Sequence, residues 1–138
     1  MKDKALELMA ASNHCVISTI GPDNQPEAAL VGFSEDKDLK ILIGTGSDTR
    51  KCKNIASNPN VAVVIADEQR KLEVQYEGKA VIYKAEDIKD RLEAHFKKLP
   101  SARARLNDPN QAWIIIEPNW IRFADLSQGY KLEEMRLP

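Results

Sequence analysis

The segment Gly44–Asn54, which reads GTGSDTRKCKN, is the part of the chain whose residue types point most directly to chemistry. A loop rich in glycine and hydroxyl groups leads into an expected helix that Asp48 or Thr49 caps and that starts with Arg50 and Lys51. The first turn of a helix exposes backbone N–H groups and the positive end of the helix dipole, and arginine adds a forked donor. Together these features predict a phosphate-binding site.

The same basic residues also fit an ordinary capped helix with a solvated face, which Lys53 extends. The helix dipole disfavours cations at the first turn, so a basic helix start asks for a reason such as a bound anion. Neither the phosphate-loop pattern GxxxxGK[ST] nor the dinucleotide pattern GxGxxG occurs in the chain. The residues alone leave both interpretations open.

The segment Glu27–Phe33 is a second candidate, because Ala28, Ala29 and Gly32 are unusually small for the interior of a sheet. Small side chains let a flat ring lie against the backbone, whose N–H and C=O groups then bind the polar edge of that ring. Close packing of two sheets or of two subunits is the simpler explanation for the same residues.

The histidines and cysteines indicate neither a metal site nor covalent catalysis. His14 and His95 are the only histidines, they lie far apart in the sequence, and neither has a carboxylate or cysteine at ligand spacing. Cys52 lies near a basic helix start, where thiols can be reactive, but a buried, inert cysteine is the simpler interpretation. We therefore nominate no catalytic residue and expect no metal.

Three aromatic residues near the end of the chain have different expected roles. Trp113 lies in the last apolar strand and is expected in the core. Trp120 and Phe123 follow Pro118, where large rings at the exit of a strand wall a pocket or an interface. Of these two roles, an interface is the one we expect.

The composition describes one globular domain over residues 1–138. The 20 Lys+Arg nearly balance the 21 Asp+Glu, which argues against a nucleic-acid-binding face. The longest purely apolar run is Val61–Ala66, far too short to span a membrane. With only two cysteines, a reduced, cytoplasmic chain is expected.

The elements expected from periodicity and turn residues are mostly strands. Val61–Ala66 is continuously apolar and is expected to be covered on both faces, whereas the alternation over Leu72–Tyr83 predicts a half-solvated strand. The closing residues Leu126–Pro138 show no clean period and are expected to be a tail. The expected strands are His14–Ile20, Glu27–Phe33, Leu39–Gly44, Val61–Ala66, Leu72–Tyr83 and Ala112–Glu117, with Trp120–Asp125 continuing in extended form.

Helices are expected at the ends and junctions of these strands: Asp3–Ala11, a helix after Thr49 that Pro59 ends by Asn58, and Glu86–Leu99. The first three strands are joined by short turns, which favours an antiparallel meander. About six strands with few crossovers predict an antiparallel β-barrel with helical caps, mainly β in the α+β class.

Three stretches of the chain resemble the pyridoxamine 5'-phosphate oxidase-like flavin proteins, whose fold is an FMN-binding split barrel. They are CVISTIGPDNQPEAALVGF, LKILIGTGSDTRKCKNIASNPNVAVVI and VQYEGKAVIY, in that order. The resemblance implies a six-stranded antiparallel split barrel and a homodimer whose two subunits share the cofactor groove. It implies that Arg50 and Lys51 hold the FMN phosphate with Thr49 beside them, and that Gly44 and Thr45 lie against the flavin and its ribityl chain.

The resemblance also implies that the main chain of Ala28, Ala29, Leu30 and Val31 contacts the flavin ring. True pyridoxamine phosphate oxidases begin this strand with Arg and end it with Lys, whereas this chain has Glu27 and Gly32. The chain therefore looks more like the short members of the family, which points to an FMN-dependent oxidoreductase with an unassigned substrate.

Two alternatives stay open. One is a deazaflavin-dependent reductase on the same fold, and the other is a non-catalytic protein that binds flavin or haem for storage or sensing.

Overall fold

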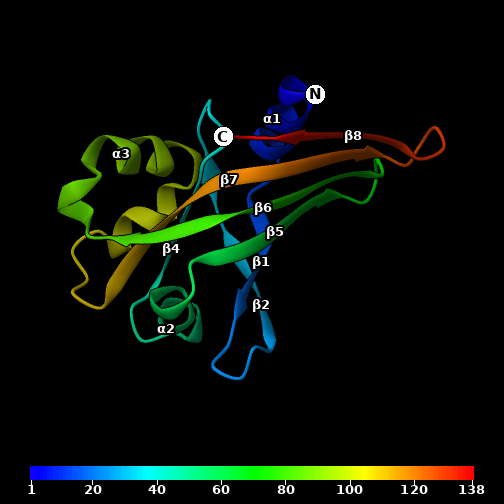
Figure 1. The fold of residues 1–138 in the computed structure, drawn as a ribbon. Coiled ribbons are helices and arrows are strands. Elements are labelled where there is room, and N and C mark those ends of the chain that lie inside the picture. Colours follow the sequence, from blue (N-terminus) through cyan, green and yellow to red (C-terminus); the bar gives the residue numbers. More distant parts are fainter.

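One antiparallel sheet of eight strands dominates the computed structural model, which describes residues 1–138 (Figure 1). The strands are β1 (His14–Ile20), β2 (Pro26–Gly32), β3 (Ser34–Glu35), β4 (Ile41–Gly46), β5 (Asn60–Asp67), β6 (Leu72–Tyr83), β7 (Gln111–Asp125) and β8 (Lys131–Arg136). The helices are α1 (Lys2–Ala11), α2 (Arg50–Ser57), α3 (Lys89–Lys98) and the 3₁₀ segments η1 (Ala85–Asp87) and η2 (Pro100–Arg105). None of these helices has the length and apolar character needed to cross a membrane.

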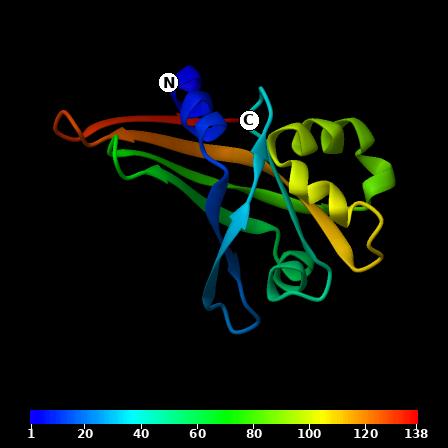
Figure 2. The ribbon, with the colours of Figure 1, turned by 180° about the vertical axis from the view of Figure 1, so that it is seen from behind.

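The strand order β2-β1-β5-β6-β7-β4-β3, with β8 on the free part of β7, curls into a half-open barrel (Figure 2). This confirms the predicted mainly β, antiparallel split barrel with capping helices, although the sheet has eight strands rather than six. The predicted meander of the first three strands is wrong for the third. Ile41, Leu42 and Ile43 of β4 are all fully buried, so β4 pairs with the apolar first half of β7 instead of with β2.

The expectation that both faces of Val61–Ala66 are covered is also wrong for the chain by itself. In β5, Val61, Val63 and Ile65 are buried, while Val64 is 39% exposed between two exposed alanines. No helix of the chain lies on that outer face, so the apolar run is half-solvated. The other expected pattern, alternation along β6, is confirmed over Val74–Ala80.

The two extended segments expected on either side of Pro118 form one long strand, β7, whose residues Trp113–Asp125 pair with the whole of β6. Proline lacks a backbone N–H and is tolerated in a sheet at irregular positions. Here the pairing register shifts between Glu77 and Gly78, opposite the proline. A Cβ on Gly78 would lie 2.4 Å from the carbonyl oxygen of Glu117, so this bulge requires glycine.

The expected tail contains the additional strand β8, which pairs with β7 from Asp125↔Lys131 to Trp120↔Arg136. Its side chains are mostly exposed and polar, which is why no hydrophobic period marks it in the sequence. Cross-strand pairing of Arg122 with Glu134 and a 3.0 Å bond from Lys4 Nζ to Glu133 hold it to β7 and α1.

Two groups of buried side chains form the core. The larger group fills the barrel. There the Tyr76 hydroxyl donates to the carbonyl oxygen of Leu39 at 2.8 Å and to that of Ile116 at 3.0 Å. The smaller group, Leu42, Leu92, Phe96 and Trp113, seats α3 on the outside of β4 and β7. The predicted helix Glu86–Leu99 is split by Ile88 into η1 and α3.

Candidate functional site

Thr49 caps the N-terminus of α2. It is one of the two residues, Asp48 and Thr49, that were predicted for this role. The Thr49 hydroxyl accepts from Cys52 N at 3.5 Å and donates to the Gly46 carbonyl at 2.9 Å. The backbone N–H groups of Arg50 and Lys51 have no acceptor within the chain. Because the Thr49 hydroxyl is already used in capping, these two N–H groups are the free donors of the helix start.

A pocket of about 490 Å³ lies between this helix start and β2. In both views α2 lies beside the turn end of the β1–β2 hairpin (Figures 1 and 2). Five residues of the predicted cofactor set line the pocket together: Ala28, Ala29, Thr49, Arg50 and Lys51. The structure therefore brings the two segments singled out in the sequence to opposite walls of one cavity.

The other two predicted residues of β2 lie outside this pocket. The Leu30 side chain is 71% exposed on the outer face of the sheet, whereas Val31 packs against the main core. Their backbone lies on the edge of the sheet, because β2 pairs only with β1. Main-chain groups along the other edge of β2 are thus free of sheet partners.

Glu27 also lines this pocket, which the sequence analysis did not predict. Its carboxylate oxygen Oε1 lies 3.3 Å from Arg50 Nε and accepts from Asn54 Nδ2 at 2.9 Å, while Oε2 accepts from Gln25 Nε2 at 2.9 Å. The hydrogen bond from Asn54, then those from Gln25 and the charge of Arg50, hold the pKa of Glu27 below its usual range. The carboxylate is therefore ionised beside the helix start.

Charge and geometry at this site fit one phosphate group. Arg50 contacts Glu27 through Nε, and its side chain is 74% exposed. Its terminal amino groups are therefore free to bind an anion. The cations Arg50, Lys51 and Lys53 outnumber the nearby carboxylates of Glu27 and Asp48 by one. This excess is smaller than the sequence cluster suggests, because Glu27 comes from a distant strand.

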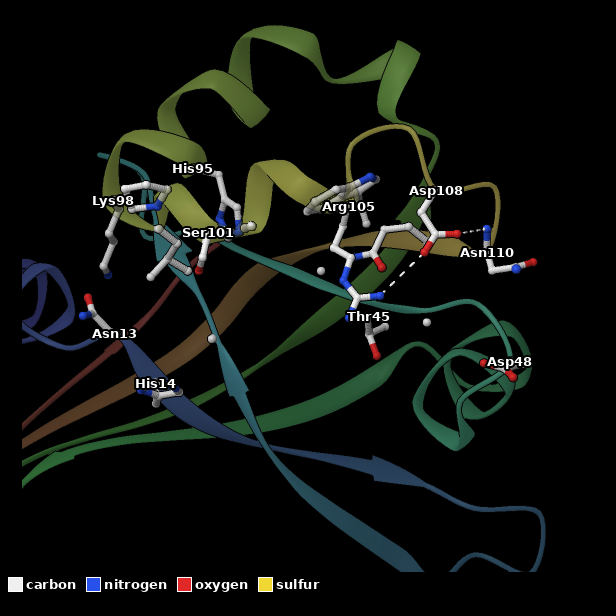
Figure 3. A pocket seen from close by; sticks show the side chains of 18 residues that line it. Asn13, His14, Thr45, Asp48, His95, Lys98, Ser101, Arg105, Asp108 and Asn110 are labelled. Carbon is white, nitrogen blue, oxygen red and sulfur yellow. Dashed lines mark hydrogen bonds and ion pairs between the residues drawn. The ribbon is translucent and has the colours of Figure 1, made fainter.

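A larger groove of about 720 Å³ adjoins this pocket, with Asp48 on the wall of both (Figure 3). Gly44 and Thr45 line it at the end of β4, and α3 with η2 forms the opposite side. The two predicted cofactor residues of β4 thus lie on the same continuous surface as Arg50 and Lys51. A long ligand with a phosphate at one end and a ring at the other matches this arrangement.

Gly44 is tied to the wall of this groove by its contact with Trp113. A Cβ at Gly44 would lie 2.6 Å from Trp113 Cζ3 and 2.7 Å from Gln111 Nε2. Trp113 is buried, as predicted, and packs edge-on against His95 and Phe96 of α3 with ring centroids 5.9 Å apart in each pair. Any residue larger than glycine would displace this ring from the groove wall.

Both histidines of the chain line the same groove, although the sequence separates them widely. His14 is exposed at the start of β1, whereas His95 is buried on α3. Burial, followed by the charges of Arg91 and Lys98, lowers the pKa of His95 to about 4. Sequence reasoning missed this meeting because the pairing of β1 with β5 and the seating of α3 on β4 are long-range features.

The remaining candidate residues lie away from the groove. Phe123 is buried in the main core and is no pocket wall, which corrects its predicted role. Trp120 is half-buried on β7 with the Arg122 guanidinium 5.3 Å from its ring centre, and its interface role stays a prediction. Cys52 is buried, with its thiol 3.5 Å from the Gly46 carbonyl.

A half-open antiparallel barrel with a basic helix start beside a long groove defines a split-barrel protein. The family model described as pyridoxamine 5'-phosphate oxidase matches residues 1–125, and the chain belongs to this family. Among curated proteins, none matches the chain.

Three solved structures place the fold among known relatives. General Stress Protein 26 from Bacillus anthracis str. Sterne is 25% identical, with a TM-score of 0.78, over 99% of this chain and 98% of that one. A pyridoxamine 5'-phosphate oxidase-related, FMN binding protein from Nostoc punctiforme PCC 73102 is 11% identical, with a TM-score of 0.70, over 99% and 94%. A heme binding protein from Mycobacterium smegmatis is 13% identical, with a TM-score of 0.81, over 99% of this chain and 58% of that one.

Proposed function

We propose that this protein binds FMN and acts as a flavin-dependent oxidoreductase with a small-molecule substrate. The observation that carries the proposal is the pocket in which the unpartnered N–H groups of Arg50 and Lys51 face the small residues of β2. This pocket continues into the groove at Gly44 and Thr45, so one ligand of FMN's shape reaches both. The existence of an FMN binding protein with the same fold supports this choice.

In this proposal each part of the site has a separate task. Arg50 and Lys51 bind the phosphate with their side chains and backbone N–H groups, while Thr49 holds the helix start in shape. The main chain of Ala28–Val31 and the Gly44–Thr45 segment orient the ring. The flavin, when bound, supplies the two-electron redox chemistry, and the protein supplies binding and orientation.

The absorption spectrum of the purified protein tests this function directly. We expect a flavin spectrum, and we expect acid release to yield FMN rather than riboflavin. If the protein is purified without a chromophore, added FMN should bind, and the fluorescence of FMN should fall as it binds. A colourless protein that also takes up no FMN would contradict the proposal. Mixing the flavin-loaded protein with reduced nicotinamides under anaerobic conditions then tests turnover.

The same spectrum separates the two alternatives. A deazaflavin would absorb at shorter wavelengths than a flavin and would be reduced without passing electrons to oxygen. Haem binding is favoured by one observation, that the exposed ring of His14 lines the groove and offers a nitrogen ligand. A Soret band that is lost on replacing His14 with alanine would establish haem in place of flavin.

We also propose that the chain forms a homodimer through the outer face of β2, β1 and β5. On this face Leu30, Val16 and Val64 lie directly opposite one another across the three strands and are all exposed. Alanines at positions 28, 62 and 66 continue the apolar surface on the same face. A contiguous apolar patch of this kind is typical of an interface. This second copy would cover the face of β5 that the sequence predicts to be buried.

Replacing Val64 with glutamate is expected to convert this dimer into monomers. The two-fold symmetry of such an interface places two unpaired carboxylates in it, so the dimer should weaken by at least about 100-fold. Sedimentation velocity over a range of concentrations measures the change. The control is Leu126→Glu, an apolar residue that is 38% exposed, as against 39% for Val64, and that lies in the turn between β7 and β8 outside the three strands of this face, so it should leave the dimer intact. A wild-type monomer, or a Val64→Glu dimer, would refute the interface.

A further inference from the structure

Beneath the groove, Arg91, Ser34 and His95 form a chain of hydrogen bonds between α3 and β3. Arg91 Nη1 donates to Ser34 Oγ at 3.0 Å, and Arg91 Nη2 donates to the Ser34 carbonyl at 2.9 Å. Ser34 Oγ lies 2.5 Å from His95 Nδ1. Ser34 and His95 are both 2% exposed, so neither group exchanges its partner for water.

The direction of these hydrogen bonds assigns the proton of the His95 ring. Arginine only donates, so Ser34 Oγ accepts from it, and the hydroxyl proton of Ser34 must go to another acceptor. The only other partner of this hydroxyl is His95 Nδ1. His95 Nδ1 is therefore the acceptor, and the neutral ring carries its proton on Nε2.

His95 Nε2 is open to the groove. It has no hydrogen-bond partner in the chain. Arg91 Nε is the one side-chain nitrogen or oxygen that is both fully buried and without a partner, so His95 Nε2 is not fully buried. His95 Nε2 is thus in contact with open space, and His95 is one of the residues that line the groove. Figure 3 shows the His95 side chain extending from α3 toward this cavity. The structure leaves one unpartnered donor on a nearly buried ring at the groove wall.

The groups around this donor keep it uncharged. Phe96 and Trp113 pack edge-on against the ring, and the ring stays neutral because burial and the charges of Arg91 and Lys98 lower its pKa to about 4. The lysine and the arginine that line the groove already have carboxylate partners. Lys98 Nζ lies 2.5 Å from Glu35 Oε1, and Arg105 Nη1 lies 3.6 Å from Asp108 Oδ2.

We propose that the Nε2–H of His95 is a fixed, uncharged hydrogen-bond donor that selects a flat ligand carrying a neutral carbonyl oxygen over the same ligand carrying a carboxylate. A carboxylate that enters this end of the groove loses water and gains no ion pair with an unpaired cation of the groove wall, because Arg91 lies behind Ser34, whereas a neutral carbonyl loses little water and gains one hydrogen bond. Arg91 and Ser34 act through His95 as positioning residues. The inference rests on the proposed function only in taking this groove as the ligand site.

Nitrogen-15 NMR of the His95 ring tests the assignment without any cofactor. We expect the spectrum to show the Nε2–H form in the free protein at neutral pH, and Ser34→Ala to give a mixture of the two neutral forms. A ring found with its proton on Nδ1 would overturn the proposal. Because this readout needs no FMN, it stands or falls separately from the proposed cofactor.

Benzamide and benzoate, which share the ring but present a neutral amide and a charged carboxylate respectively, test the selectivity. We expect benzamide to shift the His95 Nε2 resonance and to bind at least about tenfold more tightly than benzoate. His95→Phe should lose about tenfold in benzamide affinity, the value of about one hydrogen bond, whereas His95→Gln, which keeps an N–H donor, should lose less.

Equal binding of the two compounds, stronger binding of benzoate, no effect of either compound on the ring, or no loss in His95→Phe would each overturn the proposal. If His95→Phe fails to fold, the Ser34→Ala spectrum and the comparison of compounds on the wild-type protein decide the question. If FMN fails to bind while benzamide shifts His95, the inference stands and the proposed cofactor is wrong.

Discussion

Replacing Arg50 and Lys51 together with alanine is expected to weaken FMN binding by about 100-fold while changing riboflavin binding by less than about threefold. The two side chains supply charge-assisted hydrogen bonds to the phosphate, each worth about 1.5–3 kcal/mol, and exposure of Arg50 reduces the total toward the lower end. Riboflavin lacks the phosphate, so its binding reports only on the ring end. Fluorescence quenching of both ligands by the same protein preparation measures the two affinities.

The matched control replaces Lys89 and Lys97 with alanine. Both are exposed on α3, so this variant has the same change in net charge away from the phosphate site. It is expected to bind FMN within about twofold of the wild type. Equal losses of FMN and riboflavin in the Arg50 and Lys51 variant would show that the phosphate lies elsewhere.

Glu27→Gln should change FMN binding in the opposite direction. Glutamine keeps an oxygen that accepts from Asn54 but removes the negative charge 3.3 Å from Arg50 Nε. Loss of repulsion between this carboxylate and the phosphate should tighten FMN binding by about fivefold at low salt, on the order of 1 kcal/mol. Weaker binding in this variant would mean that Glu27 serves chiefly to position Arg50.

Trp113→Ala is expected to lower the free energy of unfolding by about 3–5 kcal/mol, the range for truncating a large buried aromatic side chain. Trp113 is 1% exposed and joins β7 to Phe96 and His95 of α3, so its loss leaves a cavity between two elements. Urea unfolding followed by circular dichroism measures this change. Tyr130→Ala is the control, because Tyr130 is 80% exposed and should cost less than about 0.5 kcal/mol.

Trp113→Ala is also expected to disturb the groove, because the Trp113 ring lies against Gly44. A loss of stability below about 1 kcal/mol would indicate that the α3 region rearranges to fill the cavity. In that case the amide signals of His95 and Gly44 should move together in the NMR spectrum of the variant.

The fold and the segments that line the candidate site could be predicted from the sequence because their signals are local. Residue types and turn signals marked β1 and β2, a continuous apolar run marked β5, alternation marked β6, and the hydroxyl–Arg–Lys order at the start of α2 marked a candidate phosphate site. Seven of the nine predicted cofactor residues line two adjoining cavities, whereas Leu30 and Val31 line neither. Whether FMN binds there is the subject of the first prediction.

The features that were missed depend on pairing between distant segments. Glu27 reads as an ordinary strand residue, and only the position of α2 brings its carboxylate to Arg50. β4 follows β2 closely in sequence but pairs with β7, because its side chains are buried on both faces. β8 has no hydrophobic period, since its stability comes from pairing and from charged contacts with Arg122 and Lys4.

Asn54 has a consequence for the thermodynamics of ligand binding. Its Nδ2 group donates to both Thr19 of β1 and Glu27 of β2, at 2.9 Å in each case. Because Asn54 and Thr19 are buried, α2 cannot shift against the β1–β2 hairpin without breaking hydrogen bonds that water does not replace. The separation between the helix start and β2 is therefore set before any ligand arrives, and ligand binding at this pocket would lose little conformational entropy to ordering its two walls.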